Sequence, residues 1–280
     1  MARRFDTDAA KPLSAHLRAT NVLGVDYIFG RAESTGGLLW VAGKDPDLFN
    51  YFLPERWRRT PKKKLSARNQ IFYTRTKDNI NLVWKVSRMG DSPWLKNPGA
   101  LKEEAQAHGF NSPFEEFAFA LEMSRQGVRT VYPRAIYIMT GRQRGSARPV
   151  SDERRYAALA EFHTPDGEPV VRKEYDYITI WGFWNGPDEL LAAQDGKFYQ
   201  AINARRAFTH KLISEQTLTE LTQMIARRLG HCGFEDINLR PDHLLISFDV
   251  EQKLVCDTRG KPELRFCNFE LIRRRSGLEL

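Results

Sequence analysis

Side chains that could hold a phosphate group or a metal ion lie at four places along the chain. Lys85 ends an apolar, β-rich stretch, and the acidic pair Glu115 and Glu116 stands at the start of the next helical pattern. Two more segments lie near the C-terminus: 236–246, which reads DINLRPDHLLI, and 267–270, which reads CNFE. A lysine can pair with phosphate oxygens, and carboxylates are suitable magnesium ligands. These residue types suggest phosphate or nucleotide chemistry if the fold brings them together.

Lys85 falls on the second strand of a predicted hairpin. The β-rich runs 71–75 and 81–86 are separated by the polar turn 77–79, a spacing typical of two paired antiparallel strands. The following segment, SPFEEFAFALEMSRQG, predicts a helix with Ser112 as N-cap and an acidic first turn. The sequence therefore predicts a lysine-bearing strand followed by a helix that begins with two glutamates.

The rest of the chain predicts an α+β fold with several short strands. Apolar or β-prone runs predict strands, and the region from residue 187 to Gly230 is predicted to be helical, ending in an amphipathic segment. The strands are expected at 25–30, 37–43, 130–140, 174–184, 243–250 and 264–271.

This order of elements resembles the protein-kinase-like fold. The matches are Val83-Trp84-Lys85 for the lysine strand, Glu115 or Glu116 for the ion-pair partner of that lysine, 238–246 for the catalytic loop, and 267–270 for the Asp-Phe-Gly segment. The resemblance implies a two-lobe fold with an N-terminal extension at 1–65, a β-rich N-lobe at 66–184 and a compact, mainly helical C-lobe at 185–280.

The resemblance also implies a nucleotide site. Lys85 would contact the phosphates of ATP, with Glu115 or Glu116 orienting it. Trp181 and Phe183 lie where kinase-like folds join their lobes and stack an adenine, although packing between the lobes explains these aromatics equally well.

Three departures from the family pattern remove its chemistry. Asn238 stands where the catalytic aspartate is expected, and an amide cannot accept the substrate proton. His243 and Asn268 stand where the family holds magnesium, which prefers oxygen ligands, through an asparagine and an aspartate. The sequence therefore predicts a pseudokinase-like protein with impaired or absent phosphotransfer and doubtful binding of ATP and magnesium, acting through a protein partner.

Relocated carboxylates leave a second hypothesis open. Glu270 lies two residues after Asn268, and Asp236 lies two residues before Asn238. Either could take a metal or base role in a small, active phosphotransferase. The Gly30–Gly37 segment, GRAESTGG, could cradle phosphates, but it lies far in sequence from the lysine strand.

The chain is basic, with a formal net charge of +8. Its densest basic run, Arg56–Arg68, contains Trp57 and suggests a third hypothesis, a nucleic-acid-binding protein that uses phosphate contacts and stacking. A solvated loop explains the same run, and Arg273–Arg275 equally suggest a solvated tail.

The remaining composition predicts a cytoplasmic protein without a membrane span. The chain has three cysteines, no CxxC pair and no apolar run of 18 residues. The cysteines and histidines show no metal-ligand spacing, so buried thiols explain them better than zinc does.

Overall fold

The computed structural model describes residues 12–67, 69–93, 99–143, 149–186 and 199–275. The predicted α+β class is confirmed: helices pack on a large sheet whose eight strands run antiparallel in the order β1-β2-β3-β7-β8-β6-β5-β4. These strands are β1 (Arg18–Val22), β2 (Val25–Ala32), β3 (Gly37–Ala42), β4 (Lys62–Lys64), β5 (Ile71–Arg75), β6 (Asn81–Val86), β7 (Pro133–Gln143) and β8 (Tyr175–Gly182).

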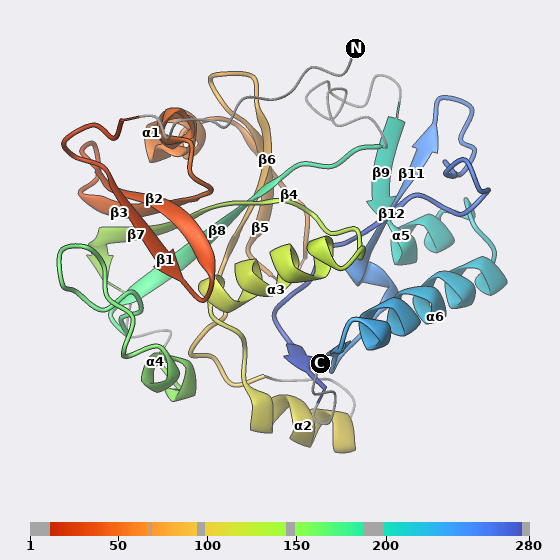
Figure 1. The fold of residues 1–280 in the computed structure, drawn as a ribbon. Helices are drawn as coiled ribbons and strands as arrows, with labels where there is room; N and C mark the ends of the chain where they lie inside the picture. Colours follow the sequence, from red (N-terminus) through yellow and green to blue (C-terminus); the bar gives the residue numbers. More distant parts are fainter. Residues whose placement is uncertain (1–11, 68, 94–98, 144–148, 187–198, 276–280) are drawn as a thin grey trace, which may run out of the picture.

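Both faces of the large sheet are buried. Because successive strand residues point to opposite faces, Trp40 packs toward the core that contains helix α3 (Pro113–Arg125), whereas Leu39 and Val41 pack toward Trp57. Trp57 ends the short helix α1 (Pro54–Trp57), which follows the 3₁₀ helix η1 (Pro46–Phe52). The sheet is therefore the middle layer between α3 and the η1–α1 segment (Figure 1).

Helix α3 begins where the sequence predicts it. The Ser112 hydroxyl accepts a hydrogen bond from the Glu115 backbone, and the Glu115 carboxylate accepts one from the Ser112 backbone, which closes a capping box. Pro113 occupies the first turn, and Gly127 follows the helix with a positive φ of 88°. This cap fixes the register of the helix and hence the direction of each first-turn carboxylate.

The described residues of the C-terminal region add two α-helices, one 3₁₀ helix and five short strands, so the prediction of a continuous helical stretch up to Gly230 is wrong in part. Tyr199–Asn203 is strand β9, which pairs with β11 because its apolar residues complete a small sheet. The other elements of this region are α5 (Ala204–Thr209), α6 (Glu215–His231), β10 (Phe234–Asp236), η3 (Pro241–His243), β11 (Leu244–Asp249), β12 (Leu264–Phe266) and β13 (Ile272–Arg274). Residues 187–198 of the predicted stretch lie outside the described residues.

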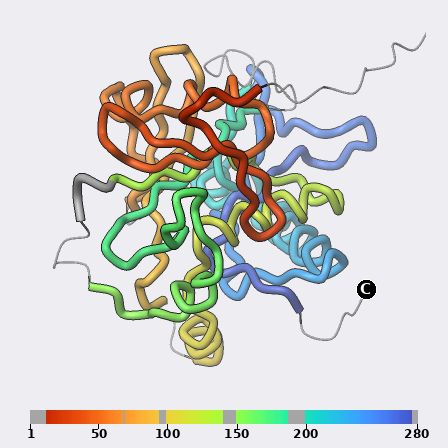
Figure 2. Tube along the Cα trace, turned by 60° about the vertical axis from the view of Figure 1, so that its left-hand side comes forward, coloured from red at the N-terminus to blue at the C-terminus, as the bar shows by residue number. Residues whose placement is uncertain are grey.

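One hydrophobic core joins the two regions. The apolar face of α6, including Ile225 and Leu229, belongs to the same buried cluster as Phe114 and Phe117 of α3. In Figures 1 and 2, α3 lies between the large sheet and α6, and the loop of the β11–β12 hairpin projects outward. Two smaller helices, α2 (Ala100–His108) and α4 (Arg154–Ala158), cover the lower side in Figure 1.

The N-terminal residues predicted to form an extension add β1–β3 to the β7 edge of the same sheet. Gly30 and Gly37 serve packing there: a side-chain carbon on Gly30 would meet Phe49 at 2.8 Å, and one on Gly37 would lie too close to the Ile138 carbonyl oxygen. Since β7 and β8 separate these glycines from the lysine strand β6, they do not cradle a ligand beside Lys85. Among the described helices, none combines the length and apolarity that a membrane crossing requires.

Candidate functional site

Lys85 lies on an interior strand of the large sheet and points toward α3. Its strand β6 runs between β5 and β8, with Lys85 opposite Ile71 and Thr179. Because the preceding residue, Trp84, packs on Trp57 on the α1 face, the alternation of strand side chains directs Lys85 to the opposite face. The side chain of Lys85 is only 8% exposed.

Two carboxylates surround the Lys85 ammonium. Its Nζ lies 2.6 Å from Glu116 Oε2 and 3.5 Å from Glu270 Oε1, and both carboxylates are buried. Glu270 also faces Arg88, with 3.7 Å between Arg88 Nη1 and Glu270 Oε2. Two basic and two acidic side chains therefore lie together, and we call Lys85, Arg88, Glu116 and Glu270 the lysine cluster.

The structure distinguishes the two glutamates that the sequence left as alternatives. Glu116, on the buried face of α3, pairs with Lys85. Glu115 instead completes the capping box and receives a hydrogen bond of 2.8 Å from Arg155. The capping geometry, which orients Glu115 back toward Ser112, leaves Glu116 as the carboxylate that faces the sheet.

The surroundings shift the pKa values of Glu116, Glu270 and Lys85. Burial raises the pKa of Glu116 to about 7 although Lys85 opposes this shift, and neither Glu116 oxygen accepts a well-directed hydrogen bond within the described chain. Burial also acts on Glu270, but Lys85 and then Arg88 hold the pKa of Glu270 below its ordinary value. Burial would lower the pKa of Lys85, yet the two carboxylates outweigh it and raise that pKa. Lys85 therefore stays charged.

A second polar chain links Asp236, His243 and Asn268. Asp236 Oδ2 lies 2.6 Å from His243 Nδ1, and Asn268 Nδ2 lies 3.0 Å from His243 Nε2. This geometry fits the imidazole tautomer that donates to Asp236 and accepts from Asn268. The Asn268 amide oxygen accepts a hydrogen bond from the Glu270 backbone at 3.4 Å, so this chain adjoins the lysine cluster.

The loop residue Asn238 is held by backbone contacts. Its backbone nitrogen donates a hydrogen bond of 2.9 Å to Asp236 Oδ1. Asp236 therefore accepts hydrogen bonds from a backbone amide and from an imidazole, and its side chain is 1% exposed. The half-buried Asn238 side chain makes no hydrogen bond with another described residue.

The two aromatics predicted near an adenine lie in different surroundings. Trp181 is 4% exposed; its ring stacks on Phe269 at 5.1 Å and 10° and meets the edge of Phe117. Phe183 is half-buried and packs at a tilt on Tyr73. Since the faces of Trp181 meet side chains from α3 and from the 267–270 segment, its contacts are those of packing between the two regions.

The residues at the predicted metal positions do not fit magnesium. The imidazole nitrogen of His243 that could ligate a metal is directed at Asn268, and Asn268 contributes no negative charge. The nearby carboxylates of Asp236 and Glu270 are engaged by hydrogen bonds and cations. No group of three or more histidine, cysteine or acidic residues in the described ranges has the arrangement of a metal site.

Sequence reasoning missed Arg88 and the Asp236–His243 contact. Arg88 follows the lysine strand, but its partner Glu270 lies 182 positions later, so no local pattern indicates the pair. Asp236 and His243 are seven residues apart on opposite sides of a predicted loop. Only the closure of that loop brings their side chains together.

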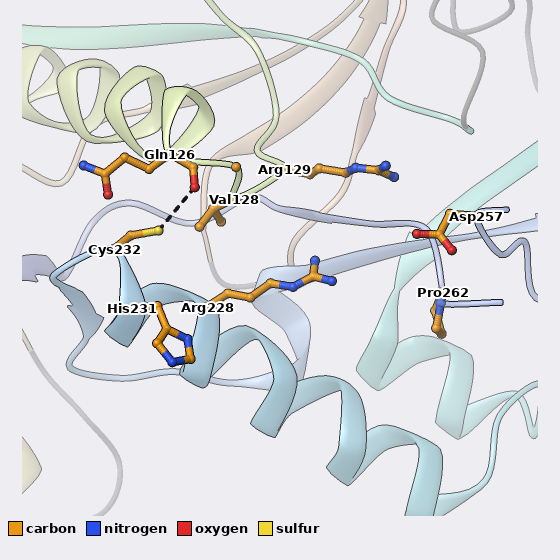
Figure 3. A pocket seen from close by; sticks show the side chains of 9 residues that line it. Gln126, Val128, Arg129, Arg228, His231, Cys232, Asp257 and Pro262 are labelled. Carbon is orange, nitrogen blue, oxygen red and sulfur yellow. Dashed lines mark hydrogen bonds between the residues drawn. The ribbon is translucent and has the colours of Figure 1, made fainter. Parts of the chain in front are cut away.

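A separate pocket of about 330 Å³ lies away from the lysine cluster (Figure 3). It is bounded by the ends of α3 and α6 and by the β11–β12 connection, and Arg228, His231 and Asp257 line it. Cys232 borders it too, with its thiol 3.6 Å from the Gln126 carbonyl oxygen. None of the residues of the predicted nucleotide site lines this pocket.

No family model, curated protein or solved structure matches the chain.

Proposed function

We propose that the chain is a degenerate, kinase-like protein, a pseudokinase that acts by binding a protein partner and not by transferring phosphate. The strand order β4-β5-β6-β8-β7 supports this reading, since the lysine strand β6 lies in one antiparallel sheet with the two strands that follow it in the chain. The helix between them in sequence, α3, carries the glutamate that pairs with Lys85. The order of the C-terminal elements supports it as well: a long helix (α6), a loop (237–243), two short strands (β11 and β12) and then the 267–270 segment.

The observation that carries the proposal is the pairing of the Lys85 ammonium with two buried carboxyl groups. In the kinase-like family that the chain resembles, this lysine contacts nucleotide phosphates, and a glycine stands at the position that corresponds to Glu270. Glu270 instead places a carboxylate 3.5 Å from Lys85 Nζ, while Glu116 remains 2.6 Å away on the other side. A phosphate would have to displace a buried carboxylate that Arg88 also holds, and that displacement opposes binding.

The geometry favours lost catalysis over relocated carboxylates. A general base needs a free lone pair within reach of the substrate proton. Asp236 is almost completely buried and accepts hydrogen bonds from His243 and from the Asn238 backbone. Glu270 is shared between Lys85 and Arg88. Both carboxylates are therefore already paired, and neither is placed as a free base or metal ligand.

Phosphotransfer assays with magnesium and ATP test the proposal. The wild-type chain is expected to show neither ATP hydrolysis nor autophosphorylation above a protein-free control. Asp236→Asn and Glu270→Gln remove the two carboxylates of the competing hypothesis while keeping their shape. A wild-type activity that disappears in either variant would establish the relocated site and overturn the pseudokinase proposal.

A further inference from the structure

The positive charge of the chain is concentrated in one short segment. Residues 56–77 contain nine of the 43 lysines and arginines and none of the 35 acidic residues, whereas the formal net charge of the whole chain is +8. The rest of the chain is therefore close to neutral. A single-sign cluster of this kind is the electrostatic footprint expected for a polyanionic partner.

The segment folds along an open edge of the large sheet. Among the described strands, β4 is the last of the sheet and has β5 as its one neighbour, with Lys62, Lys63 and Lys64 opposite Thr74, Tyr73 and Phe72. All three lysines are exposed. Because side chains alternate along a strand, Lys63 projects from one face of this edge and Lys62 and Lys64 from the other.

Further cations gather beside this edge from two other elements. The backbone nitrogen of Lys77, in the β5–β6 turn, donates a hydrogen bond of 3.1 Å to the Arg56 carbonyl oxygen at the end of α1. This contact brings the turn next to Arg58 and Arg59, which follow α1. We call six exposed or half-exposed cations beside this edge the β4 patch; they are Arg58, Arg59, Lys62, Lys63, Lys64 and Lys77.

The charges of the β4 patch are not compensated by acidic groups of the described chain. Arg56, which is not part of the β4 patch, pairs with Asp78 at 2.7 Å. Lys62 lies 4.9 Å from the Phe72 ring centre, and Lys64 reaches only the carbonyl oxygen of Ala67 at 3.4 Å. The other basic run differs: Arg273 and Arg274 pair with Glu235 and Glu122.

Edge protection explains part of the β4 patch. Lysines on an edge strand prevent it from pairing with another sheet, and Lys62–Lys64 serve that purpose. Arg58, Arg59 and Lys77 lie outside the strand, so edge protection does not require them. Their position beside the strand widens the patch into a surface on which several phosphates could be contacted together.

The aromatic residues of the region narrow the class of partner. Phe72 and Trp84 stack on each other at 4.4 Å beneath Lys62, and Trp57 is 1% exposed. A membrane surface usually receives exposed apolar side chains, and base stacking requires exposed rings. Neither Trp57 nor the Phe72–Trp84 pair beneath Lys62 supplies such a ring, so cations are the main exposed groups of this edge, with Leu65, 46% exposed, as the apolar side chain beside them.

We propose that the β4 patch binds the phosphodiester backbone of nucleic acid without reading its bases. The inference is independent of the proposed pseudokinase role, because the β4 patch shares no residue with the lysine cluster. If about five phosphates are contacted, the logarithm of the association constant falls with the logarithm of salt concentration with a slope of about −4. Single-stranded and duplex ligands both present this backbone.

Fluorescence anisotropy with a labelled 20-nucleotide RNA and a labelled 20-base-pair DNA, from 50 to 300 mM salt, tests the proposal. The triple variant Lys62→Gln, Lys63→Gln, Lys64→Gln should bind at least roughly tenfold more weakly and reduce the slope by about 2 to 3. A matched control removes three exposed charges elsewhere through Arg205→Gln, Arg227→Gln and Lys261→Gln, and should retain wild-type affinity within about twofold. Circular dichroism verifies that both variants are folded.

Four results would overturn the proposal. The wild-type chain could fail to bind either nucleic acid at 50 mM salt. Both triple variants could lose affinity equally, which would assign binding to net charge rather than to the β4 patch. Vesicles containing phosphatidylserine could bind the patch while nucleic acid does not, which would identify a membrane as the partner. Binding of polyglutamate in place of nucleic acid would identify an acidic protein.

Discussion

Replacement of Lys85 by methionine tests whether the lysine cluster stabilises the fold. The substitution keeps most of the apolar stem but removes the cation that lies 2.6 Å from Glu116 and 3.5 Å from Glu270. Both carboxylates then remain buried, and Arg88, 3.7 Å from Glu270, still compensates that carboxylate. We expect a large loss of stability near neutral pH.

The magnitude follows from the burial of the cluster. Removal of one partner from a buried ion pair costs about 3–5 kcal/mol, because the remaining charge is left without compensation. The cost should shrink at pH 5, since each stranded carboxylate can then take up a proton, and each pH unit is worth about 1.4 kcal/mol per carboxylate. Adding Glu116→Gln and Glu270→Gln to the methionine variant should restore at least half of the lost stability.

Urea unfolding followed by tryptophan fluorescence measures these differences. The matched control is Lys253→Met, because Lys253 forms an ion pair of 2.6 Å with Glu251 but its side chain is 73% exposed. That variant should lose less than about 1 kcal/mol.

Equal costs for the two methionine variants would refute the reasoning. Lys85 would then contribute no more than a surface lysine, and its pairing with two carboxylates would not hold the site closed. A triple variant no more stable than Lys85→Met alone would likewise show that the stranded carboxylates are not the cause of the loss.

Three further predictions concern the surroundings of the cluster. Burial raises the pKa of Glu116 from 4.5 to about 7, so the Glu116 contribution to stability is fully present below pH 4.5 and is lost as the pH rises to about 7. In urea unfolding, the stability of Glu116→Gln relative to wild type should therefore rise by about 3 kcal/mol across this window. A difference that stays constant with pH would contradict this. Phe269 is completely buried on Trp181, so Phe269→Ala should cost about 3–5 kcal/mol in the same assay, and a cost below about 1 kcal/mol would exclude tight packing there. Ser112→Ala should cost about 1 kcal/mol by removing the helix cap, measured as a lower urea midpoint, whereas an unchanged midpoint would show that the cap is dispensable.

Local patterns predicted the elements around Lys85 well. The hairpin of β5 and β6 has the residue bounds that the sequence indicates, and helix α3 begins at its predicted cap. Both depend on interactions between near neighbours, namely a short polar turn and a Ser-x-x-Glu cap. The lysine strand and the acidic helix start were therefore readable from the chain.

Elements that depend on distant partners were not readable. Lys62–Lys64 indicate a solvated loop by composition, yet they form β4 because β5 offers a free edge. Tyr199–Asn203 were expected to be helical, but they pair with β11. The choice of Glu116 over Glu115 also depended on the direction that the capping box gives to the first turn of α3.

Isothermal titration of magnesium and ATP into wild type and Glu270→Gly tests the closed site most directly. Wild type is expected to show no saturable heat at millimolar nucleotide, because Glu270 and Glu116 already pair with the Lys85 ammonium. Glu270→Gly, which removes one of these carboxylates, should bind more tightly than wild type, whereas the uncharged but bulky Glu270→Gln should gain less. Magnesium-dependent ATP binding to the wild-type chain that is unchanged in Glu270→Gly would contradict the account.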